Sequence, residues 1–148
     1  MNAAPIAPSF VLDASVTVAW CFEDETTAYT EAVLEFLTSG AKAVAPPLWP
    51  YEVANSLAVA ERRRRTSSAK VEAFLDRLAR FPISIDFGDS PVVSVFAKVL
   101  ALARRVRLSV YDAAYLELAL RAGLPLASLD ADLKRAAESA GVHLVRAH

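Results

Sequence analysis

The sequence has few of the residues that build disulfides or zinc sites. It contains one cysteine, Cys21, and two histidines, His143 and His148, in 148 residues. A single cysteine excludes an intramolecular disulfide and a cysteine-based zinc site. Cys21 stands in the apolar run Val-Ala-Trp-Cys-Phe, which is typical of a packed core thiol rather than a nucleophile. The histidines lie at the C-terminus, beyond any ligand spacing, and we expect His143 to face out of a last strand.

Long apolar runs and a surplus of one charge are also missing. No stretch of about 18 residues lacks a charge, so we expect no segment that spans a membrane. The N-terminus lacks the regions of a signal peptide, and with the lone cysteine this fits a cytoplasmic protein. The net charge is −1, whereas nucleic-acid binders usually have a basic surplus. The bases concentrate at 62–65 and 104–107, however, so a near-neutral total can conceal a basic face.

What the sequence does contain is apolar material for a core and an alternating order of elements. Hydrophobic residues make up 55% of the chain and charged residues 22%, which is typical of a folded globular protein. Short apolar runs alternate with segments of helical periodicity. We expect strands at 9–12, 43–45, 83–87, 125–129 and 142–145, and helices at 14–22, 27–39, 49–65, 68–81, 92–105, 112–122 and 130–140.

This alternation predicts an α/β fold, a three-layer α/β/α sandwich in which helices cover both faces of one mainly parallel sheet. No linker, repeat or low-complexity segment divides the chain. We therefore expect a single domain over residues 1–148, with the proline-rich tip 1–8 frayed.

Four acidic side chains fall where such a fold places its ligand sites. Asp13 and Asp130 each directly follow an apolar strand run. Glu52 lies in the first turn of the helix after the second strand, and Asp112 starts the helix that leads into the fourth strand. Ligands of open α/β sheets bind beyond the carboxyl ends of the strands, where the strand order reverses. The four carboxylates are therefore predicted to meet in one pocket.

Four neighbouring carboxylates favour a divalent cation. Like charges raise one another's pKa, so the four cannot all stay ionised without compensation. Ligation by oxygen alone favours Mg²⁺ or Mn²⁺, and the absence of nearby histidine and cysteine speaks against zinc. Such a metal can activate water for attack on a phosphodiester.

Most of these acids also have a simpler interpretation. Asp112 and Asp130 stand at positions typical of helix N-caps, and Glu52 in a first turn complements the helix dipole. Asp13, between two apolar residues, is harder to explain in this way.

Two polar side chains and one basic cluster accompany the acids. Asn55 follows Glu52 by three residues on the same helix face, and Ser15 follows Asp13 by two. The cluster Arg62, Arg63, Arg64 and Arg65 ends the long helix. It is either a solvated last turn that the helix dipole favours or a patch that contacts RNA phosphates.

Four segments resemble, in order, the four motifs of PIN-domain nucleases, and in particular the VapC-type toxins of toxin–antitoxin pairs. They are Val11-Leu-Asp-Ala-Ser-Val, Pro50-Tyr-Glu-Val-Ala-Asn, Tyr111-Asp-Ala-Ala-Tyr-Leu-Glu-Leu-Ala and Leu126-Ala-Ser-Leu-Asp-Ala-Asp-Leu. The resemblance covers essentially the whole chain. It implies a five-stranded sheet, a homodimer, an RNA substrate and a small cognate VapB-type antitoxin whose tail occupies the acidic groove.

The resemblance also implies roles for individual residues. The metal ligands would be Asp13, Glu52 and Asp112, completed by Asp130, which often binds through water in the family. The supporting residues would be Ser15, Asn55 and Ser128, where Ser128 stands in place of the threonine that is common there, and Asp132 competes with Asp130 for the fourth position. The implied function is that of a Mg²⁺- or Mn²⁺-dependent endoribonuclease, the toxin of a type II toxin–antitoxin system.

Other classes fit the sequence less well. A phosphatase of haloacid-dehalogenase type normally has a second aspartate two residues after the first, where Ser15 stands here. A receiver domain needs a lysine at a late strand end, and 125–129 and 142–145 contain none. A non-catalytic PIN-fold binding module would be expected to lose some of the acids, and this chain keeps all four.

Overall fold

The computed structural model describes residues 8–88 and 91–147. The strands among these residues are β1 (Ser9–Leu12), β2 (Lys42–Ala45), β3 (Ile83–Ile85) and β4 (Leu126–Ala127). The helices are α1 (Ala14–Ala19), the 3-10 helix η1 (Glu23–Glu25), α2 (Ala28–Thr38), α3 (Trp49–Arg62), α4 (Ser68–Leu78), α5 (Val92–Val106), α6 (Val110–Ala122) and α7 (Ala131–Ser139). The frayed tip expected at 1–8 lies outside the described residues apart from Pro8, and His148 lies outside them too.

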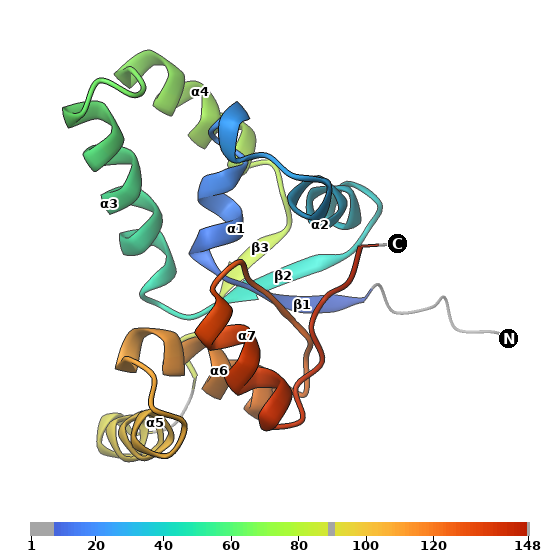
Figure 1. Cartoon of the computed structure of the whole chain (residues 1–148), viewed down its shortest axis with the longest axis vertical. Coiled ribbons are helices and arrows are strands. Elements are labelled where there is room, and N and C mark those ends of the chain that lie inside the picture. Colours follow the sequence, from blue (N-terminus) through green and yellow to red (C-terminus); the bar gives the residue numbers. More distant parts are fainter. Residues whose placement is uncertain (1–7, 89–90, 148) are drawn as a thin grey trace, which may run out of the picture.

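The strands form one parallel sheet in the order β3-β2-β1-β4. Val11 of β1 pairs with Val44 of β2 on one side and with Leu126 of β4 on the other. Figure 1 shows α1 and α2 on one side of the sheet and α6 and α7 on the other. The predicted parallel sheet between two layers of helices is therefore confirmed. The strand order reverses beside β1, because β2 and β3 follow it on one side and β4 lies on the other.

The central strand β1 carries the core and leads directly to the first acid. Phe10, Val11 and Leu12 are at most 3% exposed. A strand that is buried on both faces is a continuous apolar run rather than an alternating one. This is why β1 was recognisable from the sequence, and why a charged residue directly after it, Asp13, marks the carboxyl edge of the sheet.

The sheet has four strands rather than the five expected. Around residues 142–145 the described chain forms a single bridge between Leu126 and Leu144. The Leu126 N–H donates to the His143 carbonyl and the Val145 N–H donates to the Leu126 carbonyl, both at 2.9 Å. β4 is too short to pair with more of this segment, because Pro125 lacks an N–H and the chain leaves the sheet at Ser128 to enter α7.

Two helix ends differ from expectation in ways that affect the acids. α6 begins at Val110 rather than at Asp112, because the Ser109 hydroxyl is its N-cap and accepts the Asp112 N–H at 3.1 Å. The Asp112 side chain is therefore not used as a cap. α3 ends at Arg62 rather than Arg65, and Arg64 takes a left-handed conformation with φ of 57°.

α3 and α4 extend together beyond the sheet (Figure 1). Val53 and Leu57 of α3 and Val71 and Phe74 of α4 are buried. Burial of one apolar face per helix explains how a pair of helices far from the sheet is held in place. None of the described helices is both long and apolar enough to cross a membrane.

Candidate active site

A cavity of about 420 Å³ lies at the carboxyl edge of the sheet, where the strand order reverses. It is lined by Asp13, Glu52, Asp112 and Asp130, and we call it the acidic pocket. Its other lining residues are Ala14, Ser15, Val18, Ala19, Glu25, Ser56 and Leu129. The fold thus brings the four predicted acids together from distant parts of the chain.

Asp13 is the most buried acid of the pocket, with 5% of its surface exposed. Its Oδ2 accepts hydrogen bonds from the hydroxyls of Ser15 and Ser128, both at 2.7 Å. Each serine oxygen also accepts a backbone N–H, from Leu129 and Asp130 respectively, at 3.0 Å. Burial raises the pKa of Asp13, and the two hydroxyls oppose this rise. The serines therefore fix the carboxylate and stabilise its charged form.

Glu52 is held from α6. The hydroxyl of Tyr115 donates to Glu52 Oε1 at 2.6 Å. Burial raises the pKa of Glu52, the Tyr115 hydrogen bond lowers it, and the charges of Asp13 and Asp112 raise it further. Tyr115 itself is completely buried, and burial together with this hydrogen bond raises the pKa of its hydroxyl.

The start of α3 is anchored to the Asp13 segment. The Trp49 indole N–H donates to the Thr17 hydroxyl at 3.1 Å, and that hydroxyl donates to the Asp13 carbonyl at 3.4 Å. Both side chains are buried. This connection fixes the first turn of α3, which carries Glu52, relative to the end of β1.

Asp112 and Asp130 complete the set from the opposite layer of helices. Burial raises the pKa of Asp112, and the charges of Asp130 and Asp13 add to the rise. Asp130 combines both interpretations of its position, because its Oδ1 caps α7 by accepting the Leu133 N–H at 2.8 Å while the residue lines the pocket. The acids thus interact electrostatically across the pocket.

Asp132, the competitor of Asp130, lies elsewhere. Its side chain is 68% exposed and forms an ion pair with Arg135 on the surface of α7. It is absent from the residues that line the acidic pocket, whereas Asp130 lines it. The geometry therefore favours Asp130 as the fourth acid.

The predicted companion of Glu52 is replaced by a neighbour. Asn55 is exposed and does not line the acidic pocket, whereas Ser56 does. Glu25 of η1 also lines the pocket and was not selected from the sequence. It belongs to the acidic run 23–25, in which no spacing distinguished one acid from another.

The four arginines after α3 do not act as one group. Arg65 pairs with Asp24 at 3.0 Å and Glu25 at 3.5 Å, and its guanidinium lies 4.0 Å from the centre of the Phe22 ring. Arg62, Arg63 and Arg64 are exposed. Arg65 therefore ties the end of the α3 segment to the rim of the acidic pocket, and the other three remain candidates for phosphate contact.

A PIN domain model matches residues 10–139, which include all four acids of the pocket. The chain belongs to the PIN domain family. The resemblance seen in the four sequence motifs is therefore confirmed, and PIN domains are generally nucleases that use divalent metal ions.

Solved structures agree with this fold. PAE2754 from Pyrobaculum aerophilum is 26% identical, with a TM-score of 0.63 over 88% of this chain and 80% of its own. VapBC2 from Rickettsia felis, bound to a DNA fragment from their promoter, is 12% identical, with a TM-score of 0.64 over 93% and 97%. FitAcB from Neisseria gonorrhoeae is 18% identical, with a TM-score of 0.62 over 93% and 96%. Among curated proteins, no sequence matches this chain.

The acidic pocket of this PIN domain has donors suited to Mg²⁺ or Mn²⁺. Five acids line it, Glu25 included, and no lysine or arginine is among its lining residues. A hard divalent cation would supply the missing countercharge through oxygen ligands alone. Within 8–88 and 91–147, no three acidic, histidine or cysteine side chains stand close enough to hold a metal.

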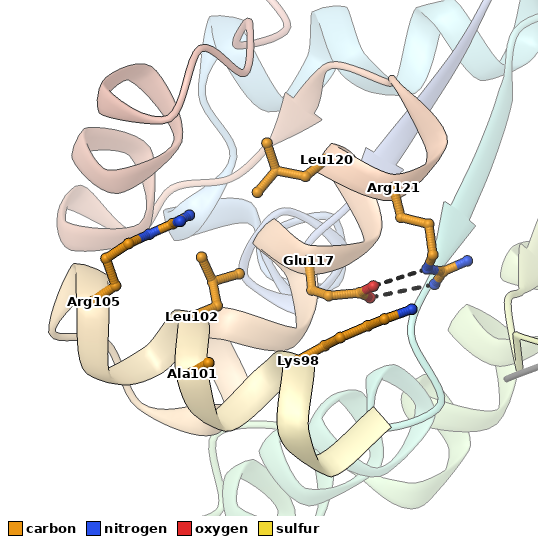
Figure 2. Close-up of a pocket in the computed structure, with 7 residues that line it drawn as sticks. All are labelled: Lys98, Ala101, Leu102, Arg105, Glu117, Leu120 and Arg121. Atoms are coloured by element: carbon orange, nitrogen blue, oxygen red, sulfur yellow. Dashed lines mark hydrogen bonds and ion pairs between the residues drawn. The ribbon is translucent and has the colours of Figure 1, made fainter. Parts of the chain in front are cut away.

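A second cavity of this PIN domain, about 490 Å³, lies between α5 and α6. Figure 2 shows Lys98 extending toward Glu117, with Arg105 at the other end of the cleft. Arg121 donates to Glu117 at 2.9 Å and pairs with Asp86 at 3.3 Å. The lining of this cleft carries three basic side chains, Lys98, Arg105 and Arg121, and a single acid, Glu117, so the cleft is net basic. The acidic pocket is thus the better candidate for metal-dependent chemistry.

Proposed function

We propose that this PIN domain is a Mg²⁺- or Mn²⁺-dependent endoribonuclease, the toxin of a type II toxin–antitoxin pair that acts in the cytoplasm. The observation that carries the proposal is the acidic pocket. Five acids from five separate segments line one cavity that has no basic lining residue. Such a cavity repels a phosphodiester unless a cation occupies it, and with a cation it attracts one.

Each acid has a distinct part in this proposal. Asp13, Glu52 and Asp112 hold the cation, and Asp130 completes the set from the start of α7. A bound divalent cation supplies Lewis acidity to the scissile phosphodiester. Ser15 and Ser128 orient the Asp13 carboxylate and favour its charged form through their 2.7 Å hydrogen bonds. The reaction is hydrolysis, in which water attacks phosphorus and the ester oxygen of the next nucleotide leaves.

Protein partners are part of the proposal. The likeness in fold to the toxin–antitoxin proteins VapBC2 and FitAcB supports a small VapB-type antitoxin as one partner. A second copy of the chain is the other partner in the proposal. The surface also carries large exposed apolar side chains around α5, among them Phe87, Val92, Val93 and Phe96. Apolar patches of this kind commonly mark protein interfaces.

The experiment is RNA cleavage by the purified protein with Mg²⁺, with Mn²⁺ and with excess EDTA. Cleavage should require the cation, and Asp13→Asn should abolish it. Asp132→Asn is the matched control, because Asp132 lies outside the acidic pocket. This variant should cleave RNA as the wild type does. Cation-dependent cleavage that survives in Asp13→Asn would show that the mechanism is wrong.

A PIN-fold module that binds without cleaving is the second candidate, and it is favoured by the separation of the acids as they stand. Titration with Mn²⁺ distinguishes the two functions. A chain that binds no Mn²⁺ and cleaves no RNA would be the inert module.

A further inference from the structure

The four acids that define the candidate site do not explain why Tyr115 forms a hydrogen bond with Glu52. It joins the hydroxyl of a fully buried tyrosine to a half-buried carboxylate at 2.6 Å, between residues 63 positions apart in the chain. A phenol is neutral near pH 7, so it donates this bond to the carboxylate. Hydrogen bonds to charged groups are short and strong, and this one has that geometry.

The position of Tyr115 on α6 gives the bond its significance. Tyr115 follows Asp112 by three residues, so the two side chains lie on one face of the helix. One turn of α6 therefore supplies one acid of the pocket and the hydroxyl that holds another. Glu52 comes from α3, which packs chiefly on α1. The bond is thus a direct connection between two segments that must place their carboxylates at the same cation.

Core packing alone does not explain the hydroxyl. A phenylalanine would fill nearly the same volume at this fully buried position, and a buried hydroxyl without a partner is costly. Glu52 is the side chain to which the Tyr115 hydroxyl donates. Among the described residues, no other group donates a hydrogen bond to the Glu52 carboxylate. Tyr115 therefore fixes one of its oxygens and leaves the other for a ligand.

We propose that Tyr115 is the positioning residue of Glu52, and that its hydroxyl orients the carboxylate for the divalent cation of the acidic pocket. The proposal rests on the proposed function and extends it, since it assigns to Tyr115 the role that Ser15 and Ser128 have at Asp13. Groups that orient metal ligands in this way typically contribute 10- to 100-fold to metal affinity or activity.

The first test is Tyr115→Phe, measured by calorimetric titration with Mn²⁺ at a temperature at which the variants are folded by circular dichroism. We expect the Mn²⁺ dissociation constant to rise by at least about 10-fold. Tyr111→Phe is the matched control, since it makes the same change four residues earlier in α6 at a side chain that is 67% exposed. Its Mn²⁺ affinity should equal that of the wild type. A Tyr115→Phe protein within twofold of the wild type overturns the proposal.

The second test approaches the bond from its other end, which also covers the case in which Tyr115→Phe does not fold. Glu52→Asp keeps a carboxylate but shortens the side chain by one methylene, so the hydroxyl is no longer reached. The Mn²⁺ affinity of Glu52→Asp should fall below that of the wild type. Tyr115→Phe should then reduce Mn²⁺ affinity much less in the Glu52→Asp background than in the wild type, because the bond it removes is already absent. Unchanged affinity in Glu52→Asp, or additive losses in the double variant, would refute the positioning role. If the wild type binds no Mn²⁺, the proposed function itself fails, and this inference fails with it.

Discussion

Replacing Ser128 by alanine removes a hydroxyl with two partners. It donates to Asp13 Oδ2 at 2.7 Å and accepts the Asp130 N–H at 3.0 Å. Ser128 is 1% exposed, so water cannot take the place of the lost group without a rearrangement. The substitution thus leaves a buried carboxylate with one hydroxyl donor fewer, and the N–H that begins α7 without its acceptor.

The cost follows from these two bonds. A hydrogen bond to a charged group contributes about 1.5–3 kcal/mol and a neutral one about 0.5–1.5 kcal/mol. We therefore expect Ser128→Ala to lower the free energy of unfolding of the metal-free protein by about 2–4 kcal/mol at pH 7. Below the pKa of Asp13 its carboxyl is protonated and both bonds are neutral, so the cost should fall to about 1–3 kcal/mol.

The sign of this pH dependence follows from linkage. Burial raises the pKa of Asp13 above its ordinary value of 3.8, and Ser128 opposes the rise. Without Ser128 the pKa in the native state rises further, so the native state loses more stability as the pH rises through that range. The cost of the substitution must therefore grow as the pH rises through the raised native-state pKa of Asp13.

The assay is equilibrium unfolding in urea at pH 7 and at a series of lower pH values, in the presence of EDTA. Ser139→Ala, at the exposed end of α7, makes the same change without a buried partner and should lie within about 0.5 kcal/mol of the wild type. A Ser128→Ala cost below about 1 kcal/mol at pH 7, or a cost that does not change with pH, would refute the reasoning.

Three further predictions concern the acidic pocket and its rim. Without metal, the wild type should lose stability as the pH rises above the ordinary carboxyl values of 3.8 and 4.5, because pocket acids with raised pKa values bind more protons in the native state. Thermal unfolding should show this slope, and saturating Mn²⁺ should reverse it by favouring the charged carboxylates; the same slope with Mn²⁺ would count against a cation site. Asp130→Ala should weaken Mn²⁺ binding by more than about 10-fold, whereas Asp132→Ala should not change it in the same titration; equal losses would exclude the assignment of Asp130. Arg65→Ala should lower the melting temperature by breaking its pairs with Asp24 and Glu25, and the difference should shrink in 1 M salt; a loss that salt does not change would mean that the packing on Phe22 dominates.

Much of the fold was predictable because the signals were local. The run Phe10, Val11 and Leu12 is apolar throughout since β1 is buried on both faces. The sequence offers Thr26 or Thr27 as the cap of α2 and Ser67 or Ser68 as the cap of α4, and Thr27 and Ser67 are the residues that cap them. The length of the last strand, expected at 142–145, was overestimated. The apolar run there does not reveal how long the neighbouring strand is, and that strand, β4, has only two residues.

The acidic pocket was predictable for a related reason, and its supporting groups were less so. Carboxylates that follow strands must gather at one edge of a parallel sheet, whatever the details of packing. The partner of Glu52 depends instead on the angle between α3 and α6, which no local pattern encodes. Tyr115 belongs to the third motif, but nothing in the motif marks its hydroxyl as the partner of Glu52. Likewise, the rotation of α3 about its axis decides that Ser56 rather than Asn55 lines the pocket.

The ion pairs of Arg65 also depend on the tertiary structure. A run of four arginines at a helix end indicates a solvated or phosphate-binding surface, and nothing in the run distinguishes its last member. The left-handed turn at Arg64 reverses the chain and directs Arg65 toward η1. Only the three-dimensional arrangement separates it from its neighbours.

The most direct test of the central claim, that the four acids form one cation site, is a calorimetric titration of the purified chain with Mn²⁺ beside Asp13→Asn. The wild type should bind Mn²⁺ with a measurable heat, and Asp13→Asn, which keeps the shape of the side chain, should bind at least about 10-fold more weakly. Binding of equal strength in the two proteins, or no binding in either, would contradict the account.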